Sequence, residues 1–185
     1  TDNVAGGRMA MERLIESIGG SGEVVVVNAL AGIPSNDARG QGAEEYAATV
    51  DGVTVLPQQH CLDQAEAMTA TENVIIGNPN LKGIFATFNR GALGAAQAIV
   101  SKGKAGEIKM VAFDADADEI KLLEDGTIDA LVVQQPYEMG KIGIEYAVKA
   151  LNGEEVPKTV APEVVIATKD NMNDEAVHKV LYPKG

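Results

Sequence analysis

The sequence has few of the residues on which metal and thiol chemistry depend. Its 185 residues include no tryptophan, one cysteine and two histidines. The single cysteine, Cys61, cannot form a disulfide within the chain or build a cysteine-based zinc site alone. The histidines, His60 and His178, leave little for a His-rich metal site. His60 and Cys61 are neighbours whose side chains diverge on an extended segment, so they do not predict a nucleophile–base pair.

Positive charge is also scarce. Lys and Arg number 15 against 27 Asp and Glu, which gives a net charge of −12. A nucleic-acid binder needs clustered Lys and Arg, so this class is excluded, and an anionic membrane surface is disfavoured for the same reason. No run reaches the roughly 18 apolar residues of a spanning helix. The chain opens on Thr1-Asp2-Asn3 rather than on a signal peptide, so we expect a processed, cut or recombinant sequence, and targeting signals give no compartment.

The sequence does contain a regular alternation of short β-branched runs with segments of helical periodicity. With 45% hydrophobic residues and a length near one domain of about 150 residues, the chain is expected to fold as one unit. The alternation predicts an α/β fold: a doubly wound, mainly parallel sheet flanked by helices. The expected strands cover residues 23–28, 53–57, 82–87, 109–113, 130–134 and 164–167. The expected helices cover residues 3–18, 39–50, 63–76, 89–102, 116–124, 136–151 and a short closing helix capped by Asn173.

The helix predicted from Pro136 to Leu151 has the clearest apolar stripe. Met139, Ile142, Tyr146 and Ala150 recur at helical spacing, and we expect this stripe to be buried.

Polar side chains stand where the predicted strands end. In open α/β sheets, ligands bind beyond the carboxyl ends of the strands. These ends supply a guanidinium, amides, a carboxylate and one aromatic ring, a mixture that suits a neutral polyhydroxylated ligand. Each of these side chains also has an explanation that involves no ligand. Asn89 and Asp114 could cap helices, Arg39 could be a solvated surface residue, and Phe88 could belong to the core. The segments concerned are Asn28 with residues 31–40, residues 58–62, residues 88–90, Asp114 and residues 134–135.

Three catalytic or metal motifs match only in part. Asp114 and Asp116 resemble the strand-end Asp-x-Asp of magnesium-dependent phosphatases, but Asp118 stands where Thr or Val is expected. The same aspartates resemble the start of an EF-hand loop, which needs a Gly where Glu119 stands. Residues 39–42, Arg-Gly-Gln-Gly, form half of a dinucleotide-binding fingerprint.

The order of several moderately specific segments carries a family resemblance over nearly the whole chain. The chain resembles the carboxyl-terminal lobe of periplasmic sugar-binding proteins of the ribose-binding type, which are solute receptors of ABC importers. The segments are Thr1 to Gly7, Ala31 to Gly42, Asn78 to Ala86, Gly91 to Ala95, Val111-Ala112-Phe113-Asp114 and Val133-Gln134-Gln135-Pro136.

The resemblance implies roles for individual residues. Arg39 matches the family's ligand arginine, Asp114 its strand-end aspartate and Gln134 a glutamine at the second hinge crossing, while Ser35 lies on a loop that touches ligand. Two positions depart from the pattern. Leu62 stands where an aromatic often packs on the sugar ring, and Phe88, beside Asn89, stands where an amide is common. The expected ligand-binding set is therefore Arg39, Asp114, Gln134, Phe88, Asn89, Ser35 and Leu62.

The resemblance also implies that one lobe of the family's two-lobed receptor is missing. Residues 1–134 would form the ligand-binding lobe, residues 135–160 a returning helix that belongs to the absent amino-terminal lobe, and residues 161–185 a last strand and helix. The apolar stripe of the returning helix would then form a surface patch. We expect the helix to fold back, to swap with a second copy of the chain, or to pair with a separately supplied lobe.

The function that the resemblance implies is binding rather than catalysis. We expect a periplasmic or extracellular, lipid-anchored receptor that binds a small sugar or polyol, delivers it to a membrane permease and uses neither metal nor cofactor. An effector-binding domain of a lac-repressor-type regulator stays open as an alternative. A phosphatase that uses Asp114 and Asp116 is the remaining one.

Overall fold

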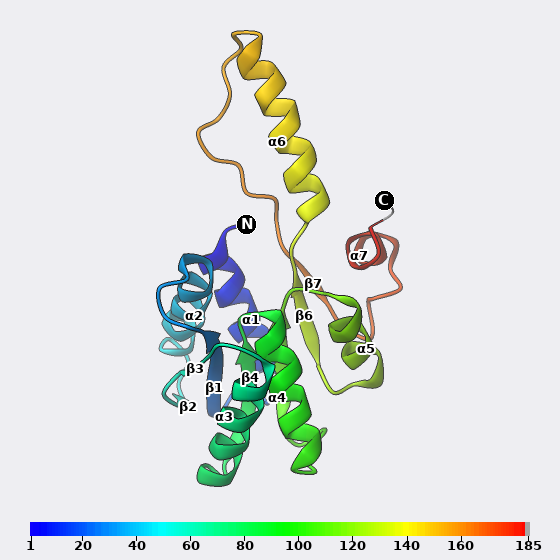
Figure 1. Cartoon of the computed structure of the whole chain (residues 1–185). Helices are drawn as coiled ribbons and strands as arrows, with labels where there is room; N and C mark the ends of the chain where they lie inside the picture. Colours follow the sequence, from blue (N-terminus) through cyan, green and yellow to red (C-terminus); the bar gives the residue numbers. More distant parts are fainter. Residues whose placement is uncertain (184–185) are drawn as a thin grey trace.

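The chain folds around one twisted, seven-stranded sheet. The computed structural model describes residues 1–183 (Figure 1). The strands lie in the order β2-β1-β4-β5-β6-β7, and β3 pairs with β1 beyond the end of β2. All pairs are parallel except β6 with β7, which confirms the predicted mainly parallel sheet. The strands are β1 (Gly22–Ala29), β2 (Val53–Val55), β3 (Gln59–Cys61), β4 (Leu81–Ala86), β5 (Lys109–Phe113), β6 (Ala130–Val133) and β7 (Val165–Ala167).

Helices cover both faces of the sheet. One face packs against α1 and α2, and the other against α3, α4, α5 and α7. The helices are α1 (Asn3–Ser17), α2 (Pro34–Ala47), α3 (Gln64–Gly77), α4 (Asn89–Ser101), α5 (Ala117–Asp125), α6 (Pro136–Leu151) and α7 (Glu175–Leu181). Within residues 1–183, no helix combines the length and apolar character that a membrane crossing requires.

The four valines of β1 divide between the two faces of the sheet. Val24 and Val26 pack in the cluster that includes Met11 and Leu14 of α1. Val25 and Val27 belong to the cluster on the opposite face, and all four are fully buried. Successive side chains of a strand point to opposite faces, so a continuous apolar run predicts a strand covered on both sides. That prediction is confirmed.

Several predicted boundaries are wrong, including the ends of α2 and β2, which lie at Ala47 and Val55 instead of residues 50 and 57. Three other differences are larger or concern the site. Helix α2 begins at Pro34 rather than Arg39, because a proline at the first helical position presets the backbone for a helix. Residues 59–61, expected as part of a loop, form β3 beside β1. Asp174, rather than Asn173, immediately precedes α7. The first correction matters for the site, because it puts Ser35 and Arg39 on one helix.

Two glycines let α1 and α2 approach backbone to backbone. A Cβ added at Gly7 would lie 1.9 Å from the carbonyl oxygen of Arg39, and one at Gly42 would lie 2.1 Å from that of Val4. No larger residue fits at either position without moving a helix. This close contact fixes the segment of α2 that carries Arg39.

Helix α6 extends away from the body of the molecule (Figure 1), which it contacts at its first turn, where Met139 Sδ lies 3.8 Å from Thr1 Oγ1. The prediction of a buried stripe is wrong within the described chain, since no residue of α6 is buried. The extended segment 152–164 returns along the helix to β7 and is itself mostly exposed. Of the three expected arrangements, folding back onto the lobe is not the one adopted.

Candidate functional site

Three of the predicted ligand-binding residues meet at the carboxyl ends of neighbouring strands. Asp114 follows β5 directly, Gln134 follows β6, and Arg39 reaches them from α2. The side-chain amide of Gln134 donates to Asp114 Oδ1 at 2.6 Å, and Arg39 Nη1 lies 4.0 Å from Asp114 Oδ2. The side chains of Arg39, Asp114 and Gln134 therefore converge in the folded chain.

Asp114 adopts an unusual backbone conformation. Its φ of 88° makes it the one non-glycine residue within positions 1–183 with a positive φ. Asn and Asp tolerate this region better than other residues with a side chain. The backbone N–H of Asp114 donates to the carbonyl of Val132 at 3.0 Å, which ties the turn to the adjacent strand. This conformation aims a carboxylate at Arg39 and Gln134 instead of continuing the strand.

Arg39 is held rigidly. Its Nε donates to Asn3 Oδ1 at 2.9 Å, and its Nη1 donates to the carbonyl of Thr87 at 2.8 Å. The guanidinium also stacks on Phe113, with Cζ 3.8 Å from the ring centroid. Burial lowers the pKa of Arg39 from its ordinary value, and the nearby Asp114 carboxylate opposes that shift. Arginine stays protonated under such conditions, so Arg39 is a fixed, preorganised donor and not a solvated surface residue.

A network of buried polar side chains holds the residues that carry the site in place. Thr87 Oγ1 donates to Asn28 Oδ1 at 2.6 Å, and Asn28 Nδ2 donates to Gln58 Oε1 at 2.9 Å. Asn36 Nδ2 lies 3.4 Å from Thr87 Oγ1. The sequence marks Asn28 as a strand end and Asn36 as part of a polar segment. Nothing in the sequence alone singles out Thr87, whose importance comes from its position between α2 and β1.

Asp116 and Glu119 form the amino-terminal capping box of α5. Asp116 Oδ1 accepts from the backbone N–H groups of Asp118 and Glu119, both at 3.0 Å, and Glu119 Oε2 accepts from the N–H of Asp116. The side-chain amide of Asn89 donates to the other oxygen of Asp116. Asp-x-x-Glu ahead of an apolar run is itself a helix-start signal. Asp116 therefore acts as a helix cap here, and no group of three or more metal-ligating side chains occurs in the part of the chain that the structure describes.

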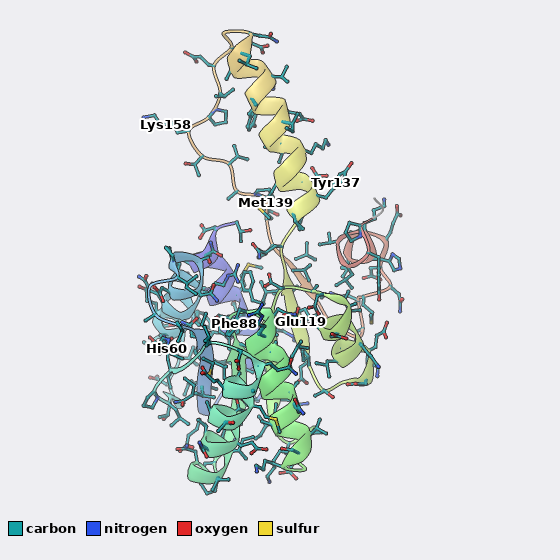
Figure 2. The ribbon with its side chains drawn as sticks, viewed as in Figure 1. His60, Phe88, Glu119, Tyr137, Met139 and Lys158 are labelled. Atoms are coloured by element: carbon teal, nitrogen blue, oxygen red, sulfur yellow. The ribbon has the colours of Figure 1, made fainter. Side chains whose placement is uncertain are left out.

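Glu119 is a buried carboxyl with one oxygen, Oε1, that has no hydrogen-bond partner. Burial raises the pKa of Glu119 to about 8, and the charges of Asp114 and Asp116 add to the effect. The group therefore holds its proton at neutral pH. Figure 2 shows Glu119 and Phe88 on the side of the lobe towards α6.

An open hollow of about 410 Å³ lies beside the polar cluster, where β1, β3 and β4 end. Leu62, Phe88 and Asn89 line it, so three more of the predicted residues come together there. Ser35 does not line it, but its hydroxyl donates to Asn36 Oδ1 at 3.1 Å. The complete lining is Ala29, Leu30, Ile33, Asn36, Cys61, Leu62, Phe88, Asn89 and Arg90.

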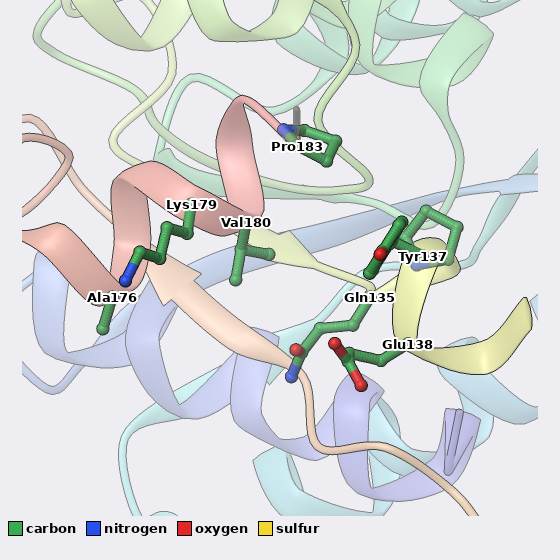
Figure 3. Close-up of a pocket in the computed structure, with 8 residues that line it drawn as sticks. Gln135, Tyr137, Glu138, Ala176, Lys179, Val180 and Pro183 are labelled. Atoms are coloured by element: carbon green, nitrogen blue, oxygen red, sulfur yellow. The ribbon is translucent and has the colours of Figure 1, made fainter. Parts of the chain in front are cut away.

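A second hollow, of about 420 Å³, lies between the start of α6 and α7 (Figure 3). Gln135, Tyr137 and Glu138 line one side, and Lys179 and Val180 line the other. None of the predicted ligand-binding residues lines it.

Comparison with known proteins gives consistent matches. A family model described as a periplasmic binding protein domain matches residues 1–155. The chain is 32% identical over 169 residues to a ribose import binding protein of Bacillus subtilis, covering 91% of this chain and 54% of that protein. It is 33% identical over 166 residues to the D-allose-binding periplasmic protein of Escherichia coli, covering 88% and 53%.

Solved structures agree with these sequence matches. An ABC transporter solute-binding protein from Agrobacterium vitis, bound to α-D-tagatopyranose, superposes with a TM-score of 0.94 and 34% identity. The superposition covers 100% of this chain and 62% of that structure. The chain thus spans about half the length of the curated relatives it matches.

Proposed function

The chain belongs to the periplasmic binding protein family, and from that premise we propose that it forms the ligand-binding second lobe of a sugar or polyol receptor for an ABC importer. The observation that carries the proposal is the meeting of Arg39, Asp114 and Gln134 at adjacent strand ends. A sugar hydroxyl both donates and accepts hydrogen bonds. Arg39 offers donors, the Asp114 carboxylate offers acceptors, and the Gln134 amide offers both. Charge-assisted bonds to Arg39 and Asp114 would be the strongest of these contacts.

We divide the chain into three parts according to the position of α6. We assign residues 1–134 and residues 161–185 to the lobe described above; of the latter, residues 161–183 return to it through β7 and α7. Residues 135–160 extend away from it and expose Tyr137 and Ile144 to 62% and 70%. Such an apolar surface implies a covering partner. We assign that role to the family's first lobe, because the relatives are nearly twice as long as this chain. A second copy of the chain that exchanges α6 is the other candidate.

We propose binding without catalysis. The relatives named above are all binding proteins by name, and one is described as periplasmic. Asp116, the second aspartate of the phosphatase-like motif, is engaged as a helix cap. We therefore assign the protein to the periplasm, or to the outer surface of a cell as a lipid-anchored receptor, with a membrane permease as its partner.

Thermal unfolding with a panel of pentoses, hexoses and polyols tests the proposal. A ligand at about 100 times its dissociation constant stabilises the folded state by about 2.7 kcal/mol. For a chain of this size that corresponds to a rise in Tm of about 5–11 °C. Phosphorylated sugars with magnesium complete the panel, because a rise with these alone would overturn the proposal in favour of the phosphatase.

Asp114→Asn is the informative variant. Asparagine keeps the shape of the side chain and tolerates the positive φ, but it removes the charge. The Tm rise with the active sugar should disappear in this variant. Asp118→Asn is the matched control, since Asp118 is exposed at the start of α5 and should keep the full rise. An unchanged rise in Asp114→Asn, or no rise with any sugar or polyol in the unmodified chain, would contradict the proposal.

A further inference from the structure

The geometry points to a ligand with one apolar end. We infer that the site prefers 6-deoxy sugars, in which a methyl group replaces the terminal hydroxymethyl, and that Leu62 and Phe88 determine this preference. The inference rests on the proposed function and names the ligand class within it.

The first observation is the composition of the hollow beside the polar cluster. Four of the side chains that line it are large and apolar, and we call this set the apolar wall: Leu30, Ile33, Leu62 and Phe88. The lining also includes the polar side chains of Asn36, Asn89 and Arg90. Leu62 is 58% exposed, and Ile33 and Leu30 are 44% and 43% exposed. Phe88 is half-buried and packs partly against the core, but the other three are largely exposed, so a ligand that covers them gains the free energy of their burial.

The second observation is that residues lining the hollow are linked to the polar cluster, although Arg39, Asp114 and Gln134 do not themselves line it. Thr87, whose carbonyl accepts from Arg39, directly precedes Phe88 in the chain. Asn36 lines the hollow one helical turn before Arg39, and its side chain approaches Thr87 Oγ1. On the other side, Asn89 lines the hollow and donates to Asp116, two residues after Asp114. We infer from these links that a ligand held by Arg39 and Asp114 extends to the apolar wall.

The third observation is that the two amide side chains that line the hollow, Asn36 and Asn89, already have partners, while the remaining charged side chain of the lining, Arg90, is exposed. The Asn36 amide nitrogen approaches Thr87, and its carbonyl oxygen accepts from Ser35. The Asn89 amide nitrogen is used by Asp116. A ligand hydroxyl placed against Leu62 and Phe88 would lose water without gaining a hydrogen bond from the wall, which carries a free-energy cost.

Phe88 is also preorganised. Its ring lies against the first turn of α4, where a Cβ added at Gly91 would come within 2.5 Å of ring atom Cε1. The absence of a side chain at Gly91 thus creates the space that the ring occupies. A wall that is already in place adds affinity without the entropy of ordering it.

The expected difference in affinity between a 6-deoxy sugar and its parent sugar can be estimated from how apolar pockets treat an added hydroxyl. A hydrophobic pocket rejects an analogue that carries one added hydroxyl by no more than about 100-fold. We therefore expect a 6-deoxyhexose to bind the chain more tightly than the hexose of the same stereochemistry, by up to about 100-fold.

Matched sugar pairs test this expectation. The pairs are D-fucose with D-galactose, L-rhamnose with L-mannose, and 6-deoxy-D-glucose with D-glucose. Each sugar is titrated into the isotopically labelled chain, and amide resonances of Leu62, Phe88, Arg39 and Asp114 are followed by NMR. The ratio of the two Kd values within a pair is the readout, so a weak overall affinity does not obscure it. In the pair that binds, the 6-deoxy member should have the lower Kd.

Leu62→Gln is the diagnostic variant, because glutamine supplies the missing hydrogen-bonding group at nearly the same size. It should bring the ratio of Kd values to about 1 or reverse it. Ile76→Gln is the matched control: Ile76 is 68% exposed at the end of α3, does not line the hollow, and should leave the ratio unchanged.

Three outcomes overturn the inference, and they separate it from the proposed function. Equal affinities within every pair that binds contradict the apolar-end preference while leaving sugar binding intact. An equal loss of affinity for both members in Leu62→Gln shows that Leu62 contacts the ligand or a covering lobe without selecting between sugars. Absence of resonance shifts with every sugar contradicts the proposed function, and the inference falls with it.

Discussion

Replacing Glu119 by glutamine should stabilise the protein at neutral pH, and the gain should depend on pH. The carboxyl is buried between Asp114 and Asp116, and its pKa is raised to about 8 in the folded state from the ordinary value of 4.5. At pH 7 the unfolded chain has this group ionised, whereas the folded chain holds the proton. The difference of 2.5 pH units between 7 and 4.5 corresponds to about 3 kcal/mol of lost stability, at 1.36 kcal/mol per unit.

The sign of the pH dependence follows from proton counting. Between pH 4.5 and about 8 the folded state binds more protons at Glu119 than the unfolded state does, so the free energy of unfolding falls as pH rises. The penalty is below about 1 kcal/mol at pH 5 and levels off above pH 8. Glutamine carries no such proton and still fits the capping box, where Glu and Gln are both suitable.

Urea unfolding of both proteins at pH 5, 6, 7 and 8 measures this effect. The Glu119→Gln variant should gain little at pH 5 and about 3 kcal/mol at pH 7 relative to the unmodified protein. Glu145→Gln on the exposed helix α6 is the control and should change stability by less than about 0.5 kcal/mol at every pH. A constant difference between the Glu119→Gln and unmodified curves across this range would refute the reasoning.

The remaining predictions concern packing and the polar network. Gly7→Ala should cost about 3 kcal/mol or more in the free energy of unfolding, because its Cβ would collide with the backbone of Arg39. Gly143→Ala, in open space on α6, should instead stabilise that helix by about 0.5–1 kcal/mol, and equal effects at the two glycines would contradict the packing argument. Thr87→Val removes the hydroxyl that donates to Asn28 and should cost about 1–3 kcal/mol by urea unfolding. A change of less than about 0.5 kcal/mol would show that Asn28 finds another donor.

The sequence is sufficient to predict the sheet and its two strand-end residues, Asp114 and Gln134, because the relevant signals are local. A run of valines buried on both faces, followed by a helical pattern, identifies a parallel strand without any knowledge of its neighbours. Once the strands are parallel, their carboxyl ends share one edge, which brings Asp114 and Gln134 together. Arg39 was predicted as a ligand residue by family resemblance, although its helix begins earlier than expected.

What could not be predicted depends on tertiary contacts. The pKa of Glu119 depends on burial and on two neighbouring aspartates, and no helix-cap pattern reveals that its Oε1 atom has no partner. The role of Thr87 depends on Asn28 and Asn36, which are distant in sequence. The stripe on α6 was predicted as buried because periodicity shows that a face is apolar but does not show what covers it.

The long connection between β6 and β7, which contains α6, also affects how the chain folds. Strands β6 and β7 pair directly, Val133 opposite Val165, yet about 30 residues separate them, and the helix α6 within this segment buries no side chain. Closing a loop of that length instead of a tight hairpin of about 4 residues costs close to 2 kcal/mol of chain entropy. A shortened variant that joins β6 to β7 by such a turn should therefore fold faster and more stably. The natural connection retains this entropic cost, which only contacts of α6 with another protein body can offset. The segment therefore lowers the stability of the lobe alone while it provides the lobe's attachment to a partner.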